Sequence, residues 1–178
     1  MNRHVQILTV VVAAVIIGFF TMAQTFRPQR MMPGENVINQ ARELTSQVFS
    51  DLKNGNSEKI AKWIVEQVGY TWDASQKVQQ TSDFKSKLDV ILLDPPAGPY
   101  GKIDGYDLID ESYLPGSNRY FRLSYISYHQ GAPLVWEFRF YVKPNSEVAL
   151  NHISWTEDNP FQYLSTNEML LPIWDKGN

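Results

Sequence analysis

The side chains of this 178-residue chain that could do chemistry are few and widely spaced. His129 and His152 are the histidines outside the amino-terminal segment, and a histidine beside a carboxylate can act as a general base. His129 precedes a Gln130-Gly131 turn, where we expect it to be solvated. His152 follows Asn151 in a predicted strand, so alternation predicts that one of these two side chains faces the helices. The spacing of the two histidines does not indicate a metal site.

Six acidic residues could be paired carboxylates or calcium ligands: Asp104, Asp107, Asp110, Glu111, Glu157 and Asp158. They do not follow the D-x-[DN]-x-[DN]-G spacing of an EF-hand loop, which excludes a calcium site of that type. We expect them to be solvated acids of strands and turns.

A charged pair lies in the clearest strand pattern of the chain. Glu137 and Arg139 are two residues apart and therefore lie side by side on one face of the strand. Arginine and tyrosine, which favour protein contacts, are expected on the same face of neighbouring strands. The pattern therefore predicts an interaction surface formed by Arg122, Tyr128, Glu137, Arg139 and Tyr141. A solvated sheet face with modest ion pairs is the alternative.

The opposite face of the same strands is aromatic and apolar, with the members Phe121, Leu123, Tyr125, Trp136, Phe138, Phe140, Ile153 and Trp155. Aromatic residues at a period of two most often form a filled core. The other interpretation is an apolar cavity that binds a small apolar ligand, lined by Tyr125, Trp136, Asn151 and Trp155.

Helical periodicity precedes these strands. Apolar residues at spacings of three and four predict a first helix over residues 35–54 and a second from Ser57 to Gly69. A third helix is predicted from near Ser82 to Asp94, where two prolines follow. Residues 70–81 are polar and remain without an assignment.

Beyond a Pro/Gly-rich stretch the period changes to two. Strands are predicted over residues 106–114, 119–129, 134–142 and 148–156, separated by turn residues. Helices followed by a meander of strands predict an α+β fold, with the helices packed on one face of an antiparallel sheet of about four strands.

This order of elements resembles the nuclear transport factor 2-like (NTF2-like) superfamily, the cystatin-related cone fold, over about residues 35–164. The resemblance lies in the segments NGNSEKIAKWI, GKIDGYDLIDESYL, YFRLSYISY, PLVWEFRFYVKP and LNHISWTEDN, which look like small bacterial envelope proteins. It implies a curved sheet around the first helix. Enzymes of this superfamily place an Asp–His pair, or an Asp with a Tyr, inside the cone, and no such pair is matched here residue by residue.

The apolar run from Ile7 to Ala23 has no charged residue and follows Arg3 and His4. Residues 1–23 therefore predict either a cleaved signal peptide or a retained single-pass membrane anchor. A buried core helix is the third interpretation. Both main interpretations export the domain, to the periplasm or to the periplasmic side of an inner membrane. Residues 24–34 are expected to be a linker.

Composition excludes several classes of function. The chain has no cysteine, which excludes disulfides, thiolate metal sites and a cysteine nucleophile. Its net charge of −3, without a basic cluster, argues against a nucleic-acid partner. The G-x-S-x-G, P-loop and dinucleotide-binding motifs are absent, and no cofactor is expected.

These observations predict a non-catalytic exported envelope module that binds a small apolar ligand or a protein partner. The protein partner would be a second copy or an envelope protein bound through the sheet face. An isomerase- or hydrolase-type enzyme acting in the cone is one alternative, and a membrane-tethered structural subunit is another. The extension 165–178 is apolar and is expected to dock on the domain or on a partner.

Overall fold

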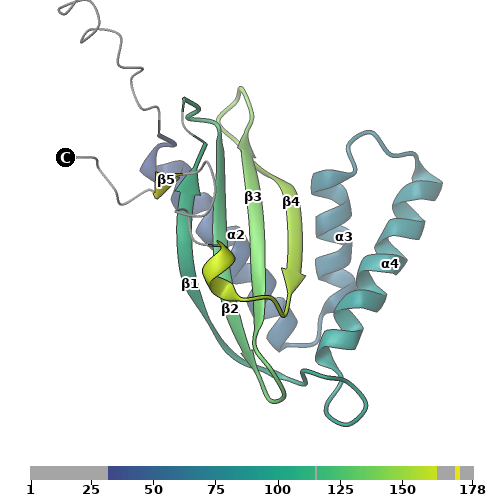
Figure 1. Ribbon diagram of the computed structural model, residues 1–178. Helices are drawn as coiled ribbons and strands as arrows, with labels where there is room; N and C mark the ends of the chain where they lie inside the picture. Colours follow the sequence, from purple (N-terminus) through teal and green to yellow (C-terminus); the bar gives the residue numbers. More distant parts are fainter. Residues whose placement is uncertain (1–31, 115, 164–170, 173–178) are drawn as a thin grey trace, which may run out of the picture. The chain divides into compact units, whose positions relative to one another are not determined.

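The computed structural model describes residues 32–114, 116–163 and 171–172. They form an α+β structure in which helices precede an antiparallel sheet, as predicted (Figure 1). The predicted segment 1–23 lies outside the described residues, as do most of the linker 24–34 and of the extension 165–178. No helix within the described ranges has the length and apolar character needed to cross a bilayer.

Three helices come first. They are α2 (Glu35–Lys53), α3 (Ser57–Val68) and α4 (Ala74–Leu92). The apolar stripe of α2 faces the sheet, and Figure 1 shows this helix behind the strands. Phe49 of α2 lies at the centre of the core, where its ring centroid is 4.2 Å from that of Tyr106 and 5.6 Å from that of Trp136. α3 packs beside the last long strand, and α4 packs on α3.

The third helix begins well before the predicted position. Asp73 accepts a hydrogen bond from the Gln76 backbone N–H at 2.8 Å, and the Gln76 side chain accepts one from the Asp73 backbone N–H at 2.9 Å. This capping box starts α4 at Ala74, in the polar stretch that hydrophobic periodicity left without an assignment. The first turns of α4 are largely exposed, which explains why they carry no apolar stripe.

Four long strands follow: β1 (Ile103–Tyr113), β2 (Tyr120–His129), β3 (Leu134–Val142) and β4 (Val148–Thr156). The bounds of β3 and β4 match the prediction, and β1 begins earlier than predicted. The two-residue strand β5 (Leu171–Pro172), which was not predicted, joins the sheet antiparallel to β1. The strand order is β4-β3-β2-β1-β5.

The chain after β4 crosses to the sheet face opposite α2. The short 3-10 helix η1 (Pro160–Tyr163) lies in front of β2 and β3 in Figure 1, whereas α2 lies behind them. The sheet therefore has a helix side, which holds the aromatic core, and an outer side, which meets the residues that follow β4.

Candidate functional site

The helix side of the sheet is filled around Phe49. Tyr125 and Trp136, two of the residues predicted to line a cavity, are buried here, and the Phe49 ring lies 5.2 Å from the Tyr125 ring. The Tyr125 hydroxyl is 2.7 Å from the Thr45 hydroxyl of α2, and burial raises the pKa of Tyr125 to about 12. Trp155 is half-buried against Trp136. Tyr125 and Trp136 therefore pack against Phe49 of α2, and Trp155 packs on Trp136.

A chain of hydrogen bonds leaves this core at one end of the sheet. The Trp136 indole N–H donates to the Ser127 hydroxyl at 2.7 Å. That hydroxyl lies 2.8 Å from His129 Nε2, and His129 Nδ1 lies 2.9 Å from the Gly101 carbonyl. When His129 is neutral, it donates from Nδ1 to the Gly101 carbonyl and accepts at Nε2 from the Ser127 hydroxyl. Every polar group in this chain of hydrogen bonds then has a partner. His129 is therefore half-buried, not solvated as predicted, and burial lowers its pKa.

The alternation from which Asn151 or His152 was predicted to face the helices is interrupted in β4. Leu150 pairs with Phe140 and His152 pairs with Arg139, so Asn151 is an extra residue on β4. This β-bulge interrupts the alternation, and both Asn151 and His152 are exposed. The His152 ring is nevertheless partly desolvated, and this partial burial and the nearby Arg139 charge lower its pKa. Asn151 is thereby separated from Tyr125, Trp136 and Trp155, with which it was predicted to line a cavity.

A buried charge cluster, defined as Asp110, Arg122 and Glu137, lies on the outer side of the sheet. The Arg122 guanidinium donates to the Asp110 carboxylate at 3.0 Å and to that of Glu137 at 3.3 Å. It also donates to the Tyr163 backbone carbonyl of η1 at 2.6 Å. The exposed fractions of Asp110, Arg122 and Glu137 are 1%, 1% and 3%. Arg122 thus joins three neighbouring strands to the segment that crosses them.

This burial corrects two expectations. Arg122 and Glu137 lie on the predicted face, but they are not solvated, since η1 meets the sheet there. Asp110 and Glu111 were expected to be solvated and are also buried. Glu111 lies on the helix side, where the Arg42 guanidinium of α2 donates to both of its carboxylate oxygens. This contact raises the pKa of Arg42.

The other residues of the predicted interaction surface reach solvent. Arg139 is partly exposed and donates to Glu137 at 2.6 Å. Tyr128 is exposed, and its hydroxyl donates to the Asp107 carboxylate at 2.8 Å. Tyr141 is exposed at the far end of β3, where Arg119 donates to its hydroxyl at 2.7 Å. That these five residues form one interaction surface stays a prediction.

The β1 edge, defined as residues 105–108 of β1, pairs with no strand other than β2 in the part of the chain that the structure describes, because β5 pairs only with Ser112 and Tyr113. Tyr106 and Leu108 are 37% and 39% exposed on it. Irregular pairing with β2 occurs between Ile103 and Gly105 and again between Leu108 and Asp110. The regular part of this edge is therefore short.

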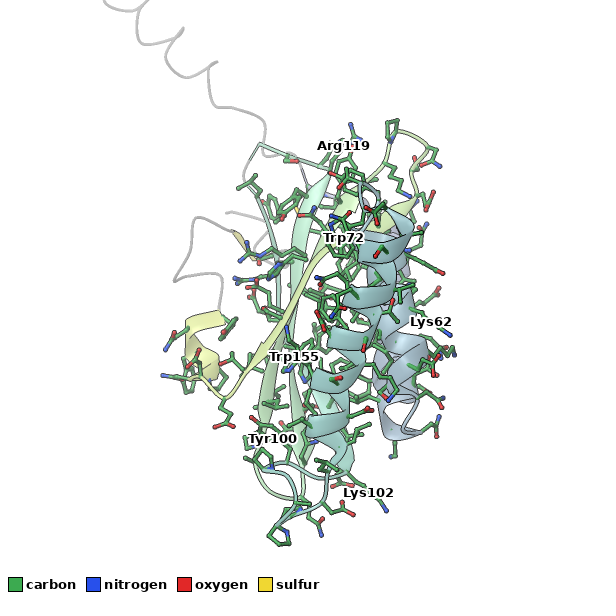
Figure 2. The ribbon with its side chains drawn as sticks, turned by 90° about the vertical axis from the view of Figure 1, so that its right-hand side faces the viewer. Lys62, Trp72, Tyr100, Lys102, Arg119 and Trp155 are labelled. Atoms are coloured by element: carbon green, nitrogen blue, oxygen red, sulfur yellow. The ribbon has the colours of Figure 1, made fainter. Side chains whose placement is uncertain are left out.

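A surface groove of about 640 Å³ lies where the end of α3 meets β3 and β4. We call it the α3–β4 groove, and its lining includes Glu66, Gln67, Tyr70, Tyr141, Lys143 and Asn151. The groove lies at the end of the sheet that carries Arg119 and Trp72, opposite the end that carries Tyr100 and Lys102 (Figure 2). Of the residues predicted to bind a ligand, Asn151 is the one that lines it.

Sequence reasoning missed the β1 edge, the role of Asp110 and the α3–β4 groove. The exposed pair Tyr106 and Leu108 could have been found, since an alternating strand that carries Asp104 and Asp107 has the composition of an edge. The groove depends on the bulge at Asn151, for which the sequence holds no clear signal. Among the described residues, no group of three His, Asp or Glu side chains could hold a metal ion.

No protein-family model, curated protein or solved structure matches this chain. We therefore infer function from the geometry of these surfaces.

Proposed function

We propose that this chain is a non-catalytic module that binds a protein partner through the β1 edge. The observation that carries the proposal is the stretch from Gly105 to Leu108, which pairs with no strand other than β2 among the described residues and carries the half-exposed Tyr106 and Leu108. An extended segment that adds to such an edge gains main-chain hydrogen bonds, and its alternate side chains contact both faces of the sheet. The NTF2-like cone and an exported location are parts of the same proposal, and the resemblance and the apolar segment 7–23 support them.

The partner segment has a defined chemistry in this proposal. On the helix side of the edge it places apolar side chains against Tyr106 and Leu108. On the outer side it meets Tyr128 and the Asp107 carboxylate, which favour a basic or hydrogen-bonding side chain. The two irregularities that flank Gly105 to Leu108 limit pairing to a short stretch. This limit favours one partner over open-ended strand addition.

The filled interior favours a protein partner over a small apolar ligand. Phe49 occupies the space between α2 and the sheet, with Tyr125, Trp136 and Phe138 around it. An apolar ligand at the predicted cavity residues would have to displace these rings. The same packing argues against the enzyme alternative, which needs space for a substrate inside the cone.

A charge placed on the β1 edge tests the proposal. Leu108→Lys puts an ammonium on the edge, and Val78→Lys makes the same type of change on the exposed surface of α4. The full-length variants are solubilised from the native host, and the proteins that copurify with each are compared with those of the wild type. We expect Leu108→Lys to lose a protein that Val78→Lys retains. Retention of every copurifying protein by Leu108→Lys would contradict the proposal.

A further inference from the structure

The α3–β4 groove is lined by side-chain amides, a carboxylate and tyrosine hydroxyls. Asn151 and Gln67 both line it, and in each the amide oxygen is bound by the protein itself. The Tyr120 hydroxyl donates to Asn151 Oδ1 at 2.9 Å, and the Leu150 backbone N–H donates to Gln67 Oε1 at 3.3 Å. Each amide is thereby oriented, and its NH₂ group remains as a donor for a ligand.

Acceptors and further donors lie in the same groove. The Glu66 carboxylate makes no ion pair within the described ranges, and it can accept two hydrogen bonds from neighbouring hydroxyls. The Tyr141 hydroxyl accepts from Arg119, so its own proton is available to donate. A ligand that satisfies this lining must offer donors and acceptors at once, as a polyol does.

Aromatic rings supply the apolar part of the lining. Tyr70 is 81% exposed at the end of α3, and within the described residues its ring stacks on no other ring. Tyr141 stands on the opposite side of the groove, at the end of β3. The Arg119 guanidinium lies over the Tyr141 ring, 5.0 Å from its centroid, so Tyr70 is the ring that offers a flat apolar face to the C–H groups of a pyranose.

The charges of the groove exclude a strongly ionic ligand. Lys143 pairs with Glu147 at 2.8 Å, which leaves the Glu66 carboxylate in the lining, and the Arg119 guanidinium bonds to the hydroxyl of Tyr141, another lining residue. One charge of each sign offers no net attraction to a polyanion or a polycation. The bulge at Asn151 is the backbone feature that turns this amide into the groove, and bulges often re-aim side chains at binding sites.

We infer that the α3–β4 groove is a binding site for an uncharged carbohydrate chain. Its sugar ring lies against Tyr70, and its hydroxyls bond to the amides of Asn151 and Gln67 and to the carboxylate of Glu66. This site is separate from the β1 edge, so either one can fail without the other.

The test follows the side-chain NH₂ signals of Asn151 and Gln67 in the NMR spectrum of the ¹⁵N-labelled full-length chain. The protein is held in a polyoxyethylene detergent, which carries no sugar headgroup. Chitotetraose, cellotetraose and maltotetraose are added in turn at millimolar concentration. We expect at least one of them to shift both NH₂ signals in a saturable way.

Variants of two lining residues and of one control residue test whether the sugar binds in the groove. Tyr70→Ala removes an exposed ring, Asn151→Ala removes one amide, and Asn118→Ala is the matched control on an exposed loop. The first two variants should each weaken binding of the active sugar about tenfold, and the control should leave it unchanged. Absence of shifts at Asn151 and Gln67 with all of these sugars would overturn the inference. Equal affinities of Tyr70→Ala and the wild type would overturn it as well.

Discussion

At the scale of single residues, the least expected feature is a fully buried arginine on the outer side of the sheet. Arg122 lies between the Asp110 and Glu137 carboxylates and also bonds to the Tyr163 carbonyl. Burying such charges is costly unless each one is paired, and the cluster pairs them across β1, β2 and β3. Arg122 therefore links the sheet to the segment that follows β4.

Removal of the Arg122 guanidinium should be strongly destabilising. Arg122→Met removes the guanidinium that the buried Asp110 and Glu137 carboxylates share, and we expect a loss of about 3–5 kcal/mol in the free energy of unfolding. Arg139→Met is the matched control, because Arg139 pairs with Glu137 from a partly exposed position and its loss should cost about 1 kcal/mol or less. Denaturant unfolding measures both variants, and equal losses would contradict the assigned role of Arg122.

His129 predicts a dependence of stability on pH. Burial lowers its pKa in the folded chain, so the unfolded chain, whose histidines titrate near about 6.5, binds the proton more readily. The stability that comes from keeping His129 neutral is therefore complete above the unfolded pKa. It is lost as the pH falls from that value towards the lower pKa of the folded state.

His129→Gln should flatten this dependence, since glutamine does not titrate. Denaturant unfolding between about pH 5 and pH 8 gives the slope of stability against pH for each variant. His152→Gln is the comparison, and its effect should be smaller because His152 is exposed. The lowered carboxylate pKa values of Asp51 and Asp89 act in more acidic solution and leave this window unaffected. An unchanged slope in His129→Gln would contradict the lowered pKa that burial gives His129.

At the scale of elements, the start of α4 depends on local capping and not on apolar packing. Asp73→Ala removes the capping box and should cost about 1 kcal/mol, with faster amide exchange concentrated in the first turns after Ala74. Asp83→Ala, in the interior of the same helix, should cost less than about 0.5 kcal/mol. Hydrogen exchange measured by mass spectrometry separates the two variants. Exchange in the first turns that Asp73→Ala does not change would mean that tertiary packing fixes the helix start.

The accuracy of the sequence-based predictions also differs from element to element. The bounds of β3 and β4 follow from apolar alternation, because these strands have one face in the core. The bulge at Asn151 could not be predicted, since it appears only when the pairing of β3 with β4 is known. The burial of Arg122 could not be predicted either, because it depends on a contact with Tyr163, which lies 41 residues later in the chain.

At the scale of the whole molecule, the described structure separates four regions with different properties. The helix side of the sheet is a filled aromatic core, the outer side holds the buried charge cluster, and the two remaining surfaces are the β1 edge and the α3–β4 groove. Because the core is filled, the proposal places the partner strand on the β1 edge.

Site-specific photocrosslinking in the native host tests that proposal most directly. A photoreactive phenylalanine derivative replaces Leu108 in one variant and Val78 of α4 in the other, two exposed apolar positions on different elements. We expect a discrete adduct at position 108 that is absent at position 78, with the crosslinked residue in an extended apolar segment of the partner. No adduct at position 108, or the same adducts at both positions, would contradict it.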